Sequence, residues 1–245
     1  MPAYFVTGTD TDAGKTLASA GLLARARREG LTTLGLKPIA SGSEATPDGL
    51  RNADALALQA ESVPAPGSLR DPAVAYATIN PFAFAPAIAP HLAARRAGVE
   101  VRLADLTGWL RPLLALERDL TLVEGAGGWR VPLNDDEDLA ELALAMALPV
   151  ILVVGLRLGC LSHARLTAEA ITASGLRLAG WIGSLVDPGL SFDAAADDAL
   201  YQDNLATLAR TLPAPCLGVI PRLVADTPPA MAAAAADHLE LPDAH

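Results

Sequence analysis

Short apolar segments alternate with helix-forming segments along most of the chain, and this alternation restricts the fold more than any other feature. The apolar segments end at Gly, Pro or a charged residue and are typical of parallel strands buried on both faces. They cover residues 3–8, 33–37, 120–124, 150–155, 178–183 and 217–221. Segments with helical periodicity cover residues 14–29, 50–60, 103–116, 138–147, 162–174 and 195–211. We therefore expect one α/β domain over residues 1–245, with a doubly wound, mostly parallel sheet and helices on both faces.

The composition excludes several classes of protein. Of the 245 residues, 51% are hydrophobic and 19% are charged, which favours one large core over a disordered chain or a small disulfide scaffold. The 18 basic and 28 acidic side chains give a net charge of −10, so a nucleic acid or an anionic membrane is not an expected partner.

The sequence also favours a cytoplasmic protein. Cys160 and Cys216 lie in apolar surroundings without the dense spacing of a secreted disulfide framework. The start of the chain lacks the basic residues and cleavage site of a signal peptide. The most apolar stretch, residues 142–156, is interrupted by Pro149 and is too short to span a bilayer comfortably.

Two stretches do not follow the alternation. Residues 63–90 are rich in proline and lack periodicity, and we expect them to form an ordered excursion over the sheet edge rather than a linker. The alanines at 232–236, preceded by two prolines, predict a short terminal helix.

The first predicted strand leads directly into the sequence GTDTDAGKT at residues 8–16, and a helix follows. In a phosphate-binding loop, backbone N–H groups and the helix dipole hold the phosphates, Lys15 reaches the terminal phosphates and Thr16 can ligate Mg²⁺. The strict pattern would need glycine in place of Thr9, whereas here Gly8 leaves a spacer one residue longer. An ordinary strand-to-helix turn is the alternative. We expect a nucleoside triphosphate to contact Asp12, Ala13, Gly14, Lys15, Thr16 and Leu17.

Two charged residues end predicted strands at the same edge of the sheet. Lys37 precedes Pro38, which extends its backbone and directs its side chain off the carboxyl edge. Glu124 ends a buried strand, where an unpaired carboxylate is costly. Thr16, Asp54 and Glu124, with phosphate oxygens and water, would form a plausible Mg²⁺ site. Taken alone, Lys37 is compatible with a solvated strand end and Asp54 with a partner for a helix dipole.

Three segments resemble the landmark motifs of the dethiobiotin synthetase family, and they occur in the same order. These segments are FVTGTDTDAGKT at 5–16, LKPIASG at 36–42 and VEGAGGW at 123–129. Further similar segments at 52–55, 80–81, 86–91, 153–160, 180–181 and 213–215 extend the resemblance over nearly the whole chain. It implies a homodimeric, Mg²⁺-dependent ligase. Such an enzyme joins CO₂ to 7,8-diaminopelargonate, activates the carbamate with ATP or another nucleoside triphosphate, and closes the cyclic urea of dethiobiotin.

The resemblance also implies roles for individual residues. Lys37, Lys15 and Thr11 would be catalytic, Asp12 and Ser41 would hold the diamine, and Gly125, Ala126 and Gly127 would let the backbone approach the nucleotide. In the family, the helix that follows Gly159 and Cys160 binds the substrate tail from the neighbouring subunit, near the subunit interface. Ser162 is expected as the N-cap of this helix. Cys160 is expected to be a packed side chain rather than a nucleophile.

The nucleotide base is the point at which the chain departs from the family. An Asn-Asp pair commonly follows the segment at 180–181, whereas this chain has Ser184 and Leu185 nearby. Pro221, Arg222 and Leu223 match the loop that contacts base and ribose. We hypothesise that discrimination between nucleobases is looser than usual.

Two other functions remain alternatives. Partner-regulated ATPases of the same fold place a second lysine four residues before the last glycine of the loop, where this chain has Asp10. A nucleotide-binding relative without catalytic activity is disfavoured by the presence of Lys15, Thr16, Lys37 and Glu124.

Overall fold

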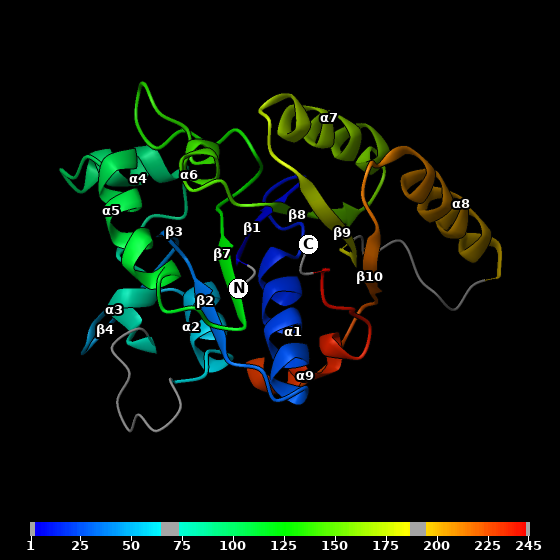
Figure 1. Cartoon of the computed structure of the whole chain (residues 1–245), viewed down its shortest axis with the longest axis horizontal. Helices are drawn as coiled ribbons and strands as arrows, with labels where there is room; N and C mark the ends of the chain where they lie inside the picture. Colours follow the sequence, from blue (N-terminus) through cyan, green and yellow to red (C-terminus); the bar gives the residue numbers. More distant parts are fainter. Residues whose placement is uncertain (1–2, 65–73, 187–194, 244–245) are drawn as a thin grey trace.

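The computed structural model describes residues 3–64, 74–186 and 195–243. In these residues, six strands form a parallel sheet in the order β10-β9-β8-β1-β7-β2 (Figure 1). The strands are β1 (Ala3–Gly8), β2 (Thr33–Leu36), β7 (Leu120–Glu124), β8 (Val150–Leu156), β9 (Leu178–Leu185) and β10 (Cys216–Ile220). The prediction of a doubly wound, mostly parallel sheet is confirmed.

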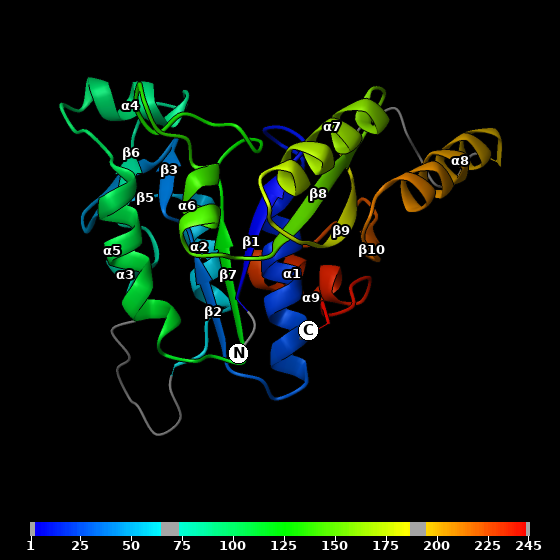
Figure 2. The same cartoon turned by 45° about the horizontal axis from the view of Figure 1, so that its top comes forward.

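Helices cover both faces of the sheet, as seen by comparing Figures 1 and 2. One face packs against α1 (Lys15–Arg28), α2 (Ala53–Ala60) and α9 (Pro228–Ala236), and the other against α5 (Leu103–Leu114), α6 (Ala140–Ala145), α7 (Cys160–Ala173) and α8 (Ala195–Thr211). The period of two residues in a strand explains this division. Tyr4 and Val6 belong to the core on the α1 face of the sheet, whereas Phe5 between them belongs to the core on the opposite face.

The chain between β2 and β7 adds a group of smaller elements beside the β2 edge of the sheet (Figures 1 and 2). β3 (Ile39–Ser41) pairs with β6 (Phe82–Phe84), and β4 (Glu44–Thr46) forms a hairpin with β5 (Gly49–Arg51). Two short helices, α3 (Tyr76–Ile79) and α4 (Pro90–Arg96), complete the group. Most of the predicted excursion at 63–90 is therefore ordered structure, although residues 65–73 lie outside the described residues.

Three predicted helix starts were wrong. The helix expected from residue 50 begins at Ala53, because residues 49–51 form β5 and the Asn52 side chain accepts hydrogen bonds from the backbone N–H groups of Asp54 and Ala55. The helix expected from residue 138 begins at Ala140. Ser162 is not an N-cap, since α7 already begins at Cys160. Gly159 is its N-cap, with a φ of 95°, a conformation that glycine adopts without a Cβ penalty.

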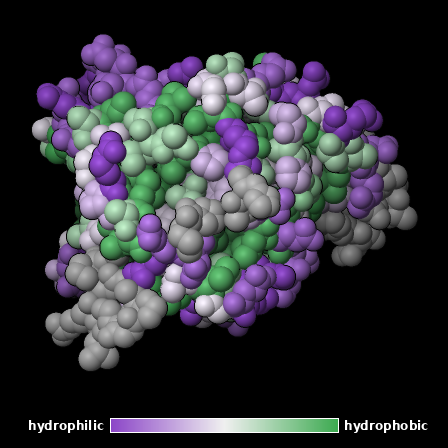
Figure 3. Space-filling view, viewed as in Figure 1, coloured by the Kyte–Doolittle hydropathy of each residue, from purple (hydrophilic) through white to green (hydrophobic). Residues whose placement is uncertain are grey.

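The surface seen in Figure 3 is mixed, with hydrophobic residues across the middle of this face and hydrophilic residues gathered toward its outline. Among the helices described, none is both long and apolar enough to cross a bilayer. Cys160 is buried, as expected, whereas Cys216 is exposed at the start of β10, contrary to the apolar surroundings expected from sequence.

Candidate active site

The loop between β1 and α1 carries Lys15 to the carboxyl end of the sheet. Gly14 is the N-cap of α1 with a φ of 87°. The ammonium group of Lys15 donates a hydrogen bond to the Asp10 carbonyl oxygen at 3.0 Å, so the side chain folds back over the loop. Burial, followed by repulsion from Lys37, lowers the pKa of Lys15 to about 8. A phosphate group would satisfy this buried cation.

The same loop is attached to β8 and to the segment that follows it. The Thr9 N–H donates to the Val153 carbonyl oxygen at 2.9 Å, and the Gly155 N–H donates to Thr9 Oγ1 at 3.2 Å. Asp10, which stands where the partner-regulated ATPases carry a second lysine, forms an ion pair with Arg157 at 2.6 Å. These contacts fix the conformation of the loop from the side of β8.

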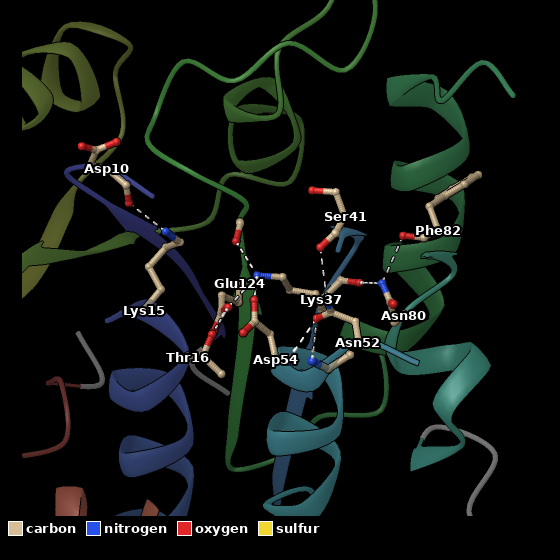
Figure 4. A network of polar contacts seen from close by, with 12 residues as sticks. Asp10, Lys15, Thr16, Lys37, Ser41, Asn52, Asp54, Asn80, Phe82 and Glu124 are labelled. Carbon is tan, nitrogen blue, oxygen red and sulfur yellow. Dashed lines mark hydrogen bonds and ion pairs between the residues drawn. The ribbon is translucent and has the colours of Figure 1, made fainter. Parts of the chain in front are cut away.

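Lys37 lies at the centre of a cluster of charged groups in which Lys37 and Glu124 are buried and Asp54 is partly exposed (Figure 4). Its Nζ atom is 2.7 Å from Glu124 Oε1, 3.1 Å from Asp54 Oδ2 and 3.0 Å from the Gly125 carbonyl oxygen. Thr16, from the first turn of α1, donates its hydroxyl hydrogen to the same Glu124 Oε1 at 2.9 Å. Four residues that are distant in sequence therefore meet at the carboxyl edge of the sheet.

The charged groups of this cluster stabilise the ionised forms of Lys37 and Asp54. Burial alone disfavours the charged form of Lys37, but the Glu124 and Asp54 carboxylates outweigh it and raise the pKa of Lys37. Burial likewise opposes ionisation of Asp54, yet Lys37 and the Thr16 hydroxyl lower the pKa of this carboxyl group. Both partners are therefore charged at neutral pH.

Two asparagines hold the backbone on which Lys37 and Ser41 are carried (Figure 4). Asn80 Nδ2 donates to the Lys37 carbonyl oxygen at 2.7 Å, and Asn52 Nδ2 donates to the Ser41 carbonyl oxygen at 3.2 Å. The hydroxyl group of Tyr76 links the two, since it accepts from the Asn52 N–H and donates to Asn80 Oδ1. Sequence reasoning did not assign these roles. The available signal was two asparagines in segments otherwise rich in apolar residues.

A cleft of about 1000 Å³ opens over this cluster. Most of the expected nucleotide and diamine residues from the amino-terminal part of the chain line it: Thr11, Asp12, Gly14, Lys15, Thr16, Leu17, Lys37, Ser41, Asp54, Ala126 and Gly127. Ala40, residues 87–90 before and at the start of α4, and the Arg130–Pro132 segment form further walls that were not expected from sequence. Glu124 and Gly125 lie below its floor, where they contact Lys37.

Other predicted residues lie away from the cleft walls. Ala13 is a buried residue of the phosphate loop, and Ser184 and Leu185 are buried in β9. Gly159, Cys160 and Ser162 at the start of α7, and Pro221, Arg222 and Leu223 after β10, do not line the cleft of their own chain. Ser184 instead faces the phosphate loop, because a Cβ atom on Gly14 would lie 2.2 Å from Ser184 Oγ.

The oxygen atoms around Lys37 fit a magnesium ion. Thr16, Asp54 and Glu124 supply the hard oxygen ligands that Mg²⁺ prefers. Glu124 is fully buried, and its Oε2 atom has no hydrogen-bond partner among the described residues, although a buried carboxylate oxygen normally has one. Among the described residues, no group of three or more His, Cys, Asp or Glu suited to a metal occurs. In the expected site, phosphate oxygens and water would supply the remaining ligands.

Comparison with known proteins shows which family the chain resembles. Residues 2–230 match a family model described as an AAA domain. The chain is 69% identical to the ATP-dependent dethiobiotin synthetase BioD of Chromohalobacter salexigens, over 99% of each chain. It is 58% identical to the protein of the same name from Pseudomonas aeruginosa, over 98% of this chain and 97% of that protein.

Among solved structures, the chain resembles the MinD cell division protein of Aquifex aeolicus, with a TM-score of 0.54, 12% identity, and coverage of 97% of this chain and 86% of that one. At this identity the likeness shows only a shared fold. The sequence matches are far closer and extend over the whole length of the relatives, including the segments that form the Lys37 cluster. The chain belongs to the dethiobiotin synthetase family.

Proposed function

We propose that this protein makes dethiobiotin from 7,8-diaminopelargonate, CO₂ and a nucleoside triphosphate. The observation that carries the proposal is that Lys15, Lys37 and Asp54 line one cleft beside a phosphate-binding loop, where Lys37 is paired with the buried Glu124. An amine of the diamine adds to CO₂ and loses a proton to give a carbamate. A carbamate oxygen attacks the γ-phosphorus and the nucleoside diphosphate leaves. The second amine then attacks the carbamate carbon, and phosphate leaves as the ring closes.

The roles of the two lysines follow from their places in the cleft. Lys15, at the start of α1, binds the terminal phosphates together with the helix dipole. Lys37 stabilises the negative charge of the carbamate and of the phosphoryl group during transfer, which is typically the largest catalytic contribution. Thr11, on the loop, supplies a hydroxyl group or backbone N–H at the same wall.

The diamine is proposed to bind between the loop and Ser41. Asp12 lines the cleft and adopts a φ of 58°, a left-handed conformation that aspartate tolerates better than most residues. Its carboxylate would hold or deprotonate an amino group of the substrate. The apolar wall near Ala40, Ile88 and Val131 suits the aliphatic chain of the diamine.

Mg²⁺ is proposed to be held by Thr16, Asp54 and Glu124, with Gly125, Ala126 and Gly127 close to the nucleotide. When bound, the ion would neutralise charge on the transferring phosphoryl group. Contacts of Ser184, Leu185, Pro221, Arg222 and Leu223 with the base and ribose remain predictions.

We further propose that the protein is a homodimer in the cytoplasm, with the active site near the subunit interface. Leu158 is fully exposed immediately before α7, and Leu166 on the same helix is 61% exposed. We propose that these two apolar side chains are part of a surface that a second copy of the chain covers. A second copy covering them would bring Gly159, Cys160 and Ser162 toward the substrate tail in the neighbouring cleft.

The test is incubation of the purified protein with the diamine, bicarbonate, Mg²⁺ and ATP, followed by mass detection of the cyclic urea. Dethiobiotin formed in proportion to the nucleoside diphosphate released supports the proposal. ATP turnover that needs no diamine and rises with a protein partner would instead indicate the partner-regulated ATPase. Nucleotide binding without turnover would indicate a non-catalytic relative.

A further inference from the structure

The ammonium group of Lys37 occupies the place between the two carboxylates that are proposed to bind Mg²⁺. Its three hydrogens have three acceptors, on Glu124, Asp54 and the Gly125 backbone, at 2.7, 3.1 and 3.0 Å. The lysine side chain is only 3% exposed. Lys37 is therefore held inside the metal-ligand cluster and does not extend freely into the cleft (Figure 4).

A bound divalent cation and this ammonium group would compete for the same oxygen atoms. Glu124 Oε1 already accepts hydrogen bonds from both Lys37 and Thr16. Mg²⁺ requires short bonds to its oxygen ligands, and a second positive charge within hydrogen-bond distance of these ligands would repel it strongly in a buried site. The lysine and the metal are thus alternative counter-ions for Glu124 and Asp54.

Lys37 cannot simply leave this place without a replacement. Glu124 is fully buried, and removal of the ammonium group that it contacts would leave a poorly compensated buried charge, with the Asp54 carboxylate nearby. The ammonium group can move into the cleft only when another cation neutralises the two carboxylates. A metal that arrives with a triphosphate supplies this charge.

We infer that Lys37 is an internal counter-cation that the metal–triphosphate complex displaces, and that this displacement turns the lysine toward the carbamate. The inference rests on the proposed Mg²⁺ ligands, and it implies that binding events and the movement of Lys37 occur in a fixed order. Lys37 becomes available to the second substrate only after the metal and nucleotide are in place. Ser41 and Ala40, which line the cleft together with Lys37, mark the wall toward which it can move.

Crystal structures of the full chain without ligands and with Mg²⁺ and a non-hydrolysable ATP analogue test the inference without turnover. We expect the Lys37 Nζ to Glu124 Oε1 distance to increase beyond hydrogen-bond range, about 3.5 Å, when the metal is bound. A metal on Asp54 or Glu124 with Lys37 still bonded to both carboxylates would overturn the inference and leave the proposed function intact. A metal bound elsewhere would overturn both the inference and the proposed ligands.

Metal affinity provides a second measurement. In the presence of the ATP analogue, Mn²⁺ monitored by electron paramagnetic resonance should bind Lys37→Met about tenfold more tightly than the wild-type protein, because a competing charge is removed. Arg95→Met is the matched control. It removes an exposed cation that pairs with Asp135 and does not line the cleft, and its Mn²⁺ affinity should be unchanged. Equal or weaker Mn²⁺ binding by a folded Lys37→Met protein would contradict the displacement. If this variant does not fold, the wild-type crystal structures decide.

Discussion

Gly14 lies directly against the side chain of Ser184, so that a Cβ atom on Gly14 would be 2.2 Å from Ser184 Oγ and 2.9 Å from Ser184 Cβ. Gly14 also has a φ of 87° and is the N-cap of α1. Two separate constraints therefore require glycine at position 14: the left-handed backbone conformation and the close contact with β9. This contact holds the loop against β9.

Substitution of Gly14 should lower the stability of the protein by more than the strain of its backbone conformation alone. We expect Gly14→Ala to lower the free energy of unfolding by about 2–4 kcal/mol, from left-handed strain and overpacking together. Gly30→Ala is the matched control, since Gly30 has a φ of 79° but no atom within 4 Å of its Cβ position, and it should cost about 1 kcal/mol. Urea denaturation measures both. Equal losses would show that the Ser184 contact contributes nothing.

Substitution of Lys37 and of Lys15 should have different effects on kcat and on triphosphate affinity. Lys37→Ala should lower kcat by a factor on the order of 10²–10³ while triphosphate affinity is not weakened, because Lys37 acts on charge that develops during the reaction. Lys15→Ala should lower kcat and also weaken triphosphate affinity, since Lys15 is proposed to contact the phosphates before and during transfer. Steady-state rates and calorimetric binding of an ATP analogue give the two quantities. Parallel losses in the two variants would refute the proposed division of roles.

Triphosphate binding should take up a proton at alkaline pH. The pKa of Lys15 is lowered to about 8 in the free protein, so the side chain is charged below this pH and increasingly neutral above it. Phosphate binding favours the charged form and raises the pKa again, so that affinity falls and proton uptake rises as the pH increases above 8. Calorimetry in buffers of different ionisation enthalpy detects this uptake, which should disappear in Lys15→Met. Proton release over the same range would be incompatible with Lys15 as the phosphate ligand.

Asn80 should act as a positioning residue for Lys37. Asn80→Ala removes the donor to the Lys37 carbonyl oxygen, and we expect a loss of about 1–3 kcal/mol in stability together with a lower kcat. Tyr76→Phe removes the hydroxyl that donates to Asn80 Oδ1 and accepts from the Asn52 N–H, but it keeps the Asn80 donor to Lys37. It should lose stability with a smaller change in kcat. If the two variants lose kcat equally at matched stability, Asn80 has only a structural role.

Discrimination between nucleobases should be weak. Ser184, at the place where the family commonly carries the amide that recognises adenine, is 3% exposed and faces the phosphate loop. A site without a hydrogen-bonding side chain for one base rejects other bases poorly. We expect kcat/KM values for ATP, CTP and GTP to agree within about tenfold. A strong preference for ATP alone, measured at subsaturating concentrations, would disprove this expectation.

The sheet could be predicted from sequence because its strands are buried on both faces and read as continuous apolar runs. The strands around Val6, Val123 and Val153 appeared within one or two residues of the predicted bounds. The pairs β3–β6 and β4–β5 could not be recognised, since each strand has only three residues and is too short to show periodicity. The start of α7 was misplaced because a serine is a common N-cap, whereas a glycine in the left-handed conformation leaves no distinct sequence signal.

The meeting of Lys37 and Glu124 could be predicted from the order of the strands and not from the pattern of apolar residues. Lys37 and Glu124 end neighbouring buried strands, so the parallel topology brings them to one edge. The asparagines that support Lys37 and Ser41, and the wall formed by residues 87–90, depend on how the chain folds back between β2 and β7. That path is set by tertiary hydrogen bonds, such as Asn80 to Lys37, which no local pattern reveals.

The group of small elements between β2 and β7 forms one side of the cleft, and the phosphate loop forms another. Ser41 and the start of α4 belong to this group, which packs on the main sheet through Ile39, Ile79 and Phe84 and through the hydrogen bond from Asn80 to Lys37. Changes confined to its cleft-lining residues can alter which acceptor molecule fits while Asp54 and the phosphate loop are kept. For protein engineers, Ala40, Ser41 and residues 87–90 are thus the positions to diversify in search of new amine acceptors.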